Sequence, residues 1–163
     1  MPDWDLLTLG TAFLLAFPVG TLCEYGIHRF VLHSRGETFI SRGHGEHHRS
    51  NRAGSLLVDF RDFSAGIIPF GWFGFLHSVP AGVAFLAGGF AFVFCLALVH
   101  KLNHEHPEIV FWMRPNSHAV HHEQTPRRNY GISSHFWDVV FGTYSPAPQQ
   151  PAVPHRPDEA LTR

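Results

Sequence analysis

The feature that most constrains this chain's fold is a stretch of 37 residues, Phe63 to Val99, without a charged side chain. A second uncharged stretch, Leu6 to Cys23, is 18 residues long. At 1.5 Å rise per residue, the shorter stretch makes a helix of about 27 Å, close to the roughly 30 Å hydrocarbon core of a bilayer. Few soluble domains of this size contain such segments, so we predict an integral membrane protein rather than a soluble one with buried core helices.

The longer stretch falls slightly short of two full spans of about 20 residues each. We therefore predict a tilted or shallow hairpin that breaks near His77–Pro80. The shorter stretch is expected to be a retained span, bent at Pro18. It does not resemble a signal peptide, because residues 1–5 carry two acids and no basic region.

Positive charge is distributed unevenly along the chain. No Lys or Arg precedes residue 24, whereas residues 24–62 hold six Arg and residues 100–163 hold five Arg and one Lys. By the positive-inside rule, both later blocks are cytoplasmic and the N-terminus lies outside. A hairpin between the two blocks satisfies this arrangement. The formal net charge of −1 gives no indication of nucleic-acid binding.

Fourteen histidines in 163 residues are the second informative feature. Four stand alone and receive no functional role: His77, His106, His135 and His155. The other ten fall into four short clusters at the borders of the apolar stretches and in the block between them: His28 and His33; His44, His47 and His48; His100 and His104; His118, His121 and His122.

Helical spacing indicates how these clusters are oriented. Residues three and four apart share a helix face, so we expect the three histidines of each HxxHH cluster to point at one small volume. His28 and His33 are about 140° apart on an ideal helix and need a helix end or a distortion between them. Because each cluster lies at or between membrane segments, we expect all four to converge at the cytoplasmic surface.

The number and type of these ligands indicate the chemistry. Neutral imidazole suits Fe, Zn, Cu or Ni, and a single structural zinc takes only four ligands. Ten imidazoles fit two ions at about five each, and two adjacent redox metals can bind and reduce O2. Oxidation of an alkyl C–H bond requires such a cofactor. We therefore predict an all-α membrane bundle with a cytoplasmic helical cap that holds a dinuclear histidine site.

Metal-bound histidines usually donate their second ring N–H to a carboxylate or a carbonyl. The candidates for such a supporting role are Glu24, Glu46, Asn103, Asn129 and Asp138. No catalytic residue beyond the metal ligands is predicted.

The cysteines and the aromatic residues of the apolar stretches are predicted to have structural roles rather than catalytic ones. Cys23 and Cys95 are expected to be small buried hydrophobes. The aromatic residues of the hairpin are expected to face lipid or to line an acyl tunnel: Phe70, Trp72, Phe73 and Phe75.

The histidine clusters and their flanks resemble the fatty acid hydroxylase and sterol desaturase superfamily, most closely its fatty acid 2-hydroxylase branch. The resemblance covers about residues 20 to 145. It is carried by EYGIHRF at 24–30 with His33, HGEHH at 44–48, HKLNH at 100–104, HAVHH at 118–122, NYGIS at 129–133 and WDVVFGT at 137–143.

This resemblance implies a membrane-embedded helical fold with the ten clustered histidines as ligands of two Fe ions, Zn being possible in place of Fe. It also implies hydroxylation of a lipid acyl chain with O2 and electrons. No cytochrome b5 domain occurs in the 163 residues, so we expect a separate electron donor of the cytochrome b5 or ferredoxin type. The excess of Arg over Lys and the missing haem domain favour a bacterial inner membrane.

Several alternatives remain open from the sequence. Within the same chemistry, the chain could be a sterol desaturase-like enzyme or a carotenoid ring hydroxylase. Outside it, the alternatives are a non-enzymatic zinc-binding membrane protein and a metal-dependent hydrolase. Residues 1–145 are predicted to form one membrane-embedded domain, and residues 146–163, which are rich in Pro, a disordered tail.

Overall fold

A computed structural model describes residues 5–34, 38–113 and 116–146, so the predicted tail lies outside these ranges except for Pro146. The described residues form helices and no strands. In chain order these are α1 (Leu6–Ile27), η1 (His28–Leu32), α2 (Phe39–Ser50), α3 (Leu56–Gly71), η2 (Trp72–Leu76), α4 (Val79–Glu105), η3 (Phe111–Met113), α5 (Ser117–Glu123) and α6 (Phe136–Val140).

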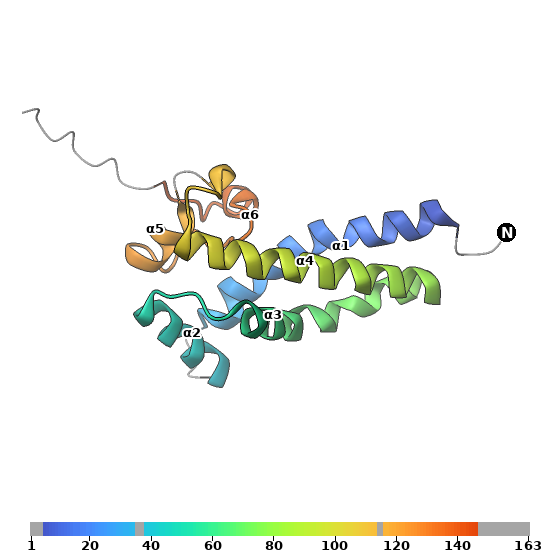
Figure 1. Ribbon diagram of the computed structural model, residues 1–163, viewed down its shortest axis with the longest axis horizontal. Helices are drawn as coiled ribbons and strands as arrows, with labels where there is room; N and C mark the ends of the chain where they lie inside the picture. The colour runs from blue at the N-terminus through green and yellow to red at the C-terminus, as the bar shows by residue number, and fades with distance from the viewer. Residues whose placement is uncertain (1–4, 35–37, 114–115, 147–163) are drawn as a thin grey trace, which may run out of the picture.

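The molecule is an elongated bundle of α1, α3 and α4, with α2, α5 and α6 gathered at one end (Figure 1). Two continuous helical segments are long and apolar enough to cross a membrane, Leu6–Leu32 and Val79–Glu105. The predicted all-α membrane bundle is therefore confirmed. The first segment extends beyond the uncharged stretch and includes Glu24, whose side chain is buried against the protein.

The two spanning helices pack closely because small residues lie between them. A Cβ atom on Gly88 of α4 would overlap the carbonyl oxygen of Phe13 on α1, and one on Gly20 of α1 would overlap the ring of Phe92. Small residues at such crossings allow the close backbone approach typical of membrane helix pairs. The buried core continues from this crossing through Val93.

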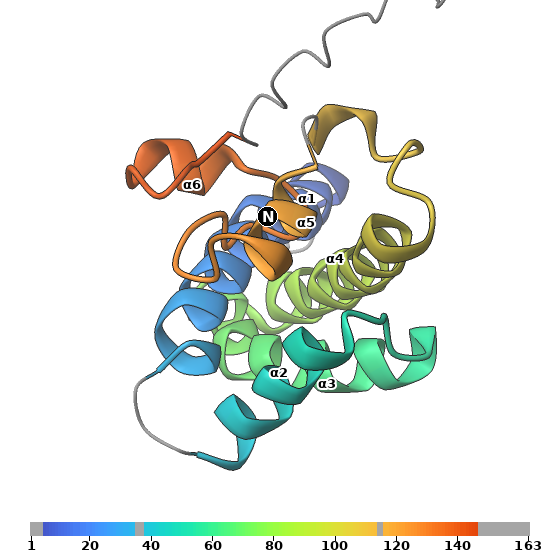
Figure 2. The same cartoon turned by 90° about the vertical axis from the view of Figure 1, so that its left-hand side faces the viewer.

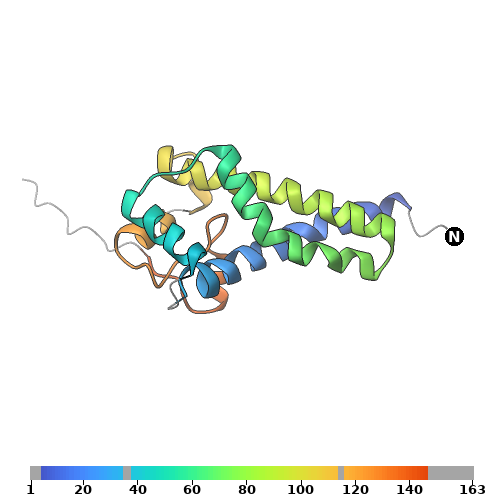
Figure 3. The ribbon, with the colours of Figure 1, turned by 90° about the horizontal axis from the view of Figure 1, so that it is seen from below.

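The predicted hairpin is also present. It breaks between Leu76, the last residue of η2, and Ser78, whose side chain caps α4 by accepting a hydrogen bond from Ala81 N at 3.3 Å. From there α4 returns alongside α3 (Figure 3). The first arm begins at Leu56, before the uncharged stretch, because Ser55 provides an N-cap.

The exposure of the hairpin aromatics and of the two cysteines agrees only in part with the predictions. Trp72, Phe73 and Phe75 are exposed on the bundle surface, as predicted for lipid-facing aromatics. Both cysteines are free, but only Cys23 is partly buried. The prediction that Cys95 is buried was wrong, because its side chain is exposed on the surface of α4.

Candidate metal centre

A π-helical turn brings the first two histidines onto one side of α1. In η1 the backbone N–H of His33 donates to the carbonyl of His28 at 3.1 Å, five residues back along the chain. This wider turn supplies the distortion that the sequence requires, since each π turn takes more residues than an α turn. The two imidazole centroids are consequently 5.0 Å apart.

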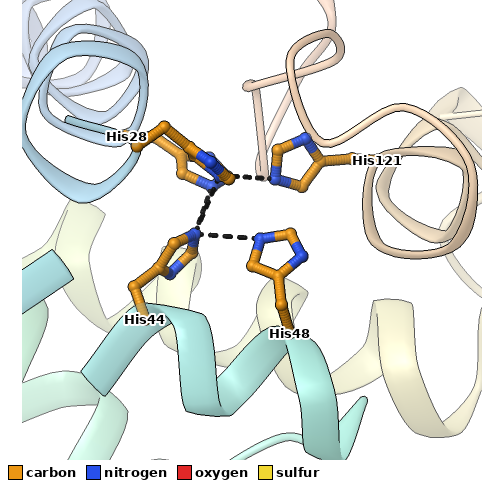
Figure 4. A group of neighbouring side chains, drawn as sticks. His28, His44, His48 and His121 are labelled. Carbon is orange, nitrogen blue, oxygen red and sulfur yellow. Dashed lines mark hydrogen bonds between the residues drawn. The ribbon is translucent and has the colours of Figure 1, made fainter. Parts of the chain in front are cut away.

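Five imidazoles form the first histidine cluster at this end of the bundle. Their ligand nitrogens all lie within 4.8 Å of one another, and they come from η1 and its flank, from α2 and from α5. Figure 4 shows four of them pointing toward a common centre. The members of the first histidine cluster are His28, His33, His44, His48 and His121.

The remaining five histidines form a second cluster beside the first. Four of them meet the same 4.8 Å criterion: His47, His104, His118 and His122. His100 joins them because its Nε2 lies 3.1 Å from Nε2 of His47. The two clusters touch where the rings of His48 and His122 stack, with centroids 4.1 Å apart.

Each HxxHH motif is divided between the two clusters, which corrects the expectation that its three histidines share one volume. In α2, His44 and His48 enter the first cluster and His47 enters the second. In α5 the assignment is reversed: His118 and His122 enter the second cluster and His121 the first. Adjacent helical residues differ by about 100° in direction, so consecutive histidines face two neighbouring centres rather than one.

The spacing of the ring nitrogens fits metal ligation. Nε2 of His44 lies 3.0 Å from Nε2 of His33 and 3.1 Å from that of His28. In the second cluster, Nε2 of His118 lies 3.0 Å from that of His104. With metal–nitrogen bonds of about 2.1 Å, adjacent ligands of an octahedron are about 3.0 Å apart. The converging nitrogens therefore have the separation that a shared ion requires.

The outer ring nitrogens set the tautomers that such ligation needs. Nδ1 of His28 lies 2.5 Å from the carbonyl oxygen of Tyr130, and Nδ1 of His121 lies 2.6 Å from that of Arg128. A carbonyl only accepts, so both Nδ1 atoms carry the proton and both Nε2 lone pairs face the cluster centre. Several lone pairs aimed at one point repel one another, and a bound cation relieves this repulsion.

Burial keeps these imidazoles neutral, which is the form that binds metal. Burial first, and then the neighbouring imidazoles His33 and His48, lower the pKa of His44 to about 2. Burial also lowers the pKa of His47 to about 4 and that of His121 to about 3. Both clusters are thus ready to bind cations at neutral pH.

A carboxylate that contacts a clustered histidine comes from a residue outside the predicted set. Asp59 on α3 is buried, and its Oδ2 lies 2.8 Å from Nδ1 of His100. A carboxylate in this position orients the imidazole and strengthens it as a ligand. One sequence feature could have identified Asp59 as a supporting residue: it is an acid in the first turn of an apolar helix, three residues after Leu56.

Four of the five predicted supporting residues bond to the backbone around the site instead of to a histidine ring. The Glu24 carboxylate accepts hydrogen bonds from the backbone N–H groups of Ile132 and Ser133. Asn103 donates to the carbonyl of Ile132, also without contacting a histidine ring.

Asp138 accepts hydrogen bonds from the N–H groups of Tyr130 and Gly131, both at 2.8 Å. Since Tyr130 holds His28 through its carbonyl, the influence of Asp138 on the cluster is indirect. Asn129, with φ of 57°, pairs with the backbone of Ser145.

Glu46 differs from the other four. Its side chain is 75% exposed and forms a 3.7 Å ion pair with Arg49. It lines the open depression beside the first cluster, together with His44 and His48, and pairs with Arg49 rather than with a histidine ring.

The four isolated histidines stay outside both clusters where they are described. His77 is exposed in the hairpin turn. His106 is also exposed, and its Nδ1 lies 3.3 Å from Oε1 of Glu108. His135 packs against Tyr144, and His155 lies outside the described residues.

The fold and this end of the bundle define a class: a membrane-embedded helical protein with two adjacent all-histidine clusters that can hold metal ions. The chain belongs to the fatty acid hydroxylase family, whose sequence profile matches residues 13–143.

Individual relatives agree with this assignment. The chain is 32% identical over 133 residues to dihydroceramide fatty acyl 2-hydroxylase FAH2 of Arabidopsis thaliana, covering 76% of this chain and 56% of the relative. It is 29% identical over 171 residues to fatty acid 2-hydroxylase of Rattus norvegicus, covering 93% and 45%. The chain thus spans about half the length of these curated relatives.

A solved structure shares the fold. It is described as full-length scs7p with only the hydroxylase domain visible, and it is similar to this chain with a TM-score of 0.64 and 25% sequence identity. The similarity covers 86% of this chain and 58% of the other.

Proposed function

We propose that this protein is a non-haem di-iron oxygenase that hydroxylates a lipid acyl chain. The observation that carries the proposal is the pair of adjacent all-imidazole clusters at one end of an apolar helical bundle. The relatives named as fatty acyl and fatty acid 2-hydroxylases support an acyl chain as substrate over a sterol or carotenoid ring.

The ten clustered histidines would hold the two ions, five at each. Four imidazoles are oriented by partners on their outer nitrogens, those of His28, His47, His100 and His121. When bound, the metals supply the activation of O2 that an alkyl C–H bond requires. The balanced reaction is R–H + O2 + 2 e⁻ + 2 H⁺ → R–OH + H2O, with electrons from a separate protein of the cytochrome b5 or ferredoxin type.

A narrow apolar crevice of about 20 Å³ lies in the bundle near the site, and we propose that it widens to admit the acyl chain. It lies between α1, α3 and α4, and its lining includes Cys23 and Val93. These residues precede His28 and His100 by five and seven positions, about 8 and 10 Å along their helices. An acyl chain that entered between these helices would approach the clusters through apolar side chains, which would position the chain and exclude water.

The opposite side of the first cluster is open to water. A depression of about 700 Å³ beside it is lined by His33, His44 and His48 together with Arg42 and Arg49. We propose that the electron donor approaches here, from the cytoplasm. The Arg-rich blocks that flank the hairpin support this orientation, with a bacterial inner membrane as the setting.

The proposal is tested by lipid analysis of cells that express the wild type, His121→Ala or His77→Ala. We expect hydroxylated acyl chains that depend on O2 in the wild type, and their loss in His121→Ala together with reduced bound metal. His77→Ala removes a histidine outside the clusters and should match the wild type. A wild type that holds metal and is supplied with reductant but forms no hydroxylated lipid would contradict the proposed function.

A further inference from the structure

The short helix α6 exposes an apolar face outside the two spanning helices. Phe136, Val139, Val140 and Phe141 are each between 50% and 58% exposed. From residue 129 to residue 146 the only charged side chain is Asp138, which is completely buried and bonded to backbone N–H groups. The outer surface of this segment therefore carries no formal charge.

The contacts of α6 place it beside the membrane-spanning part of α1. Trp137 Nε1 donates to Oγ1 of Thr21 at 3.0 Å, and the ring of Phe141 stacks on Tyr25 with centroids 5.2 Å apart. Figure 2, viewed toward the histidine end, shows α6 standing to one side of the bundle. Next to Thr21 on α1, Leu22 is 41% exposed on the lipid-facing surface.

The depth of these contacts can be estimated along α1. Thr21 is 15 residues beyond Leu6, or about 22 Å at the helical rise, within a hydrocarbon core of roughly 30 Å. If this core begins at Leu6, α6 lies about 8 Å inside its opposite boundary. Interfacial helices bury their apolar faces by about 5–10 Å, so this depth suits one.

We propose that α6 is a membrane-inserted helix. Its residues Phe136, Val139 and Val140, together with Phe141 directly after the helix, contact acyl chains of the leaflet next to the histidine clusters. The occupant is lipid because this face continues the lipid-facing surface of α1 at the same depth. This inference concerns membrane contact and does not depend on the proposed oxygenase activity.

The inserted helix is linked to the first histidine cluster by two hydrogen bonds. Its Asp138 accepts from the backbone N–H of Tyr130 at 2.8 Å, and the Tyr130 carbonyl accepts from Nδ1 of His28 at 2.5 Å. Lipid contact at α6 thereby fixes the position of one imidazole of the first cluster relative to the bilayer.

The test uses the full chain with Cys23→Ala and Cys95→Ala, and with one new thiol from Val140→Cys or, as the control, Arg127→Cys. Arg127 is exposed in the loop between α5 and α6. Each thiol is labelled with a bimane fluorophore in mild detergent, and the protein is then placed, one chain per disc, in phosphatidylcholine nanodiscs. Quenching by brominated lipid reports acyl-chain contact, and quenching by iodide reports contact with water.

We expect bimane at position 140 to be quenched by brominated lipid, and roughly tenfold less by iodide than bimane at position 127, because an ion is costly to bring into hydrocarbon. Val139→Cys should give the same quenching as Val140→Cys. Agreement between the two variants shows that the result does not come from misfolding of one of them. Equal iodide quenching at positions 140 and 127 would overturn the proposal. Protection from iodide only in discs that hold two chains would also overturn it, in favour of a second copy as the occupant.

Discussion

At the scale of the residue, Asp59 orients one histidine of the second cluster. Its carboxylate holds the second ring nitrogen of His100, and Gly54 leaves room for it, since a Cβ atom there would overlap Oδ1 of Asp59. Nδ1 of His100 therefore carries its proton toward α3, and Nε2 faces His47. The second cluster thus depends on a side chain that is not itself a ligand.

We expect Asp59→Ala to weaken metal binding at the second cluster by about 10–100-fold, because supporting carboxylates contribute that much to metal sites. Asp59→Asn keeps an oxygen acceptor and should recover part of the affinity. Asp62→Ala removes an exposed acid from the same helix and should have no effect. Metal per chain, measured by elemental analysis during titration with a chelator, separates these outcomes. Equal metal retention in Asp59→Ala and Asp62→Ala would rule out the role of Asp59.

At the scale of the element, the π turn of η1 sets the direction of His33. It places two histidines five residues apart on one side, as i and i+4 residues are placed on an α-helix. Val31 within this turn is exposed, so its side chain is not needed for packing.

Deletion of Val31 should convert η1 to an α turn in which His28 and His33 are four residues apart, and metal binding should persist. Insertion of one Ala after Val31 gives a separation of six residues, or about 240° on an α-helix, and should abolish binding at the first cluster. Metal stoichiometry of the two purified variants checks both outcomes. Loss of metal in the deletion and its retention in the insertion would refute the role assigned to the turn.

At the scale of the whole molecule, the α1–α4 contact sets how the clusters meet. His28 lies at the end of α1 and His100 near the end of α4. The distance between these helices therefore sets the distance between one histidine of the first cluster and one of the second. Gly88 permits this short distance because a Cβ atom there would overlap the backbone of Phe13.

Gly88→Ala should destabilise the protein by about 1–3 kcal/mol, the usual cost of overpacking. Gly10→Ala on α1 is the matched control, because no atom lies within 4 Å of the added methyl group. Thermal unfolding in one detergent compares the two variants. A Gly88→Ala protein as stable as Gly10→Ala would show that the helices can separate without cost.

The sequence by itself determined the class of fold and the participating histidines. Uncharged stretches long enough for a bilayer predicted the spans and the hairpin, and clustering along the chain selected all ten imidazoles that the structure brings together. These features are local, because hydropathy and side-chain direction depend on neighbours along one helix.

Only the tertiary structure decided how the ten histidines divide into two clusters. His47 and His48 are adjacent in sequence, yet they join different clusters. His47 meets histidines from α4 and α5, whereas His48 meets histidines from η1 and its flank and from α5. The structure also selected Asp59 and the carbonyls of Tyr130 and Arg128 as orienting groups. Every residue has a carbonyl and any acid can be buried, so these roles depend on which distant segments pack against each ring.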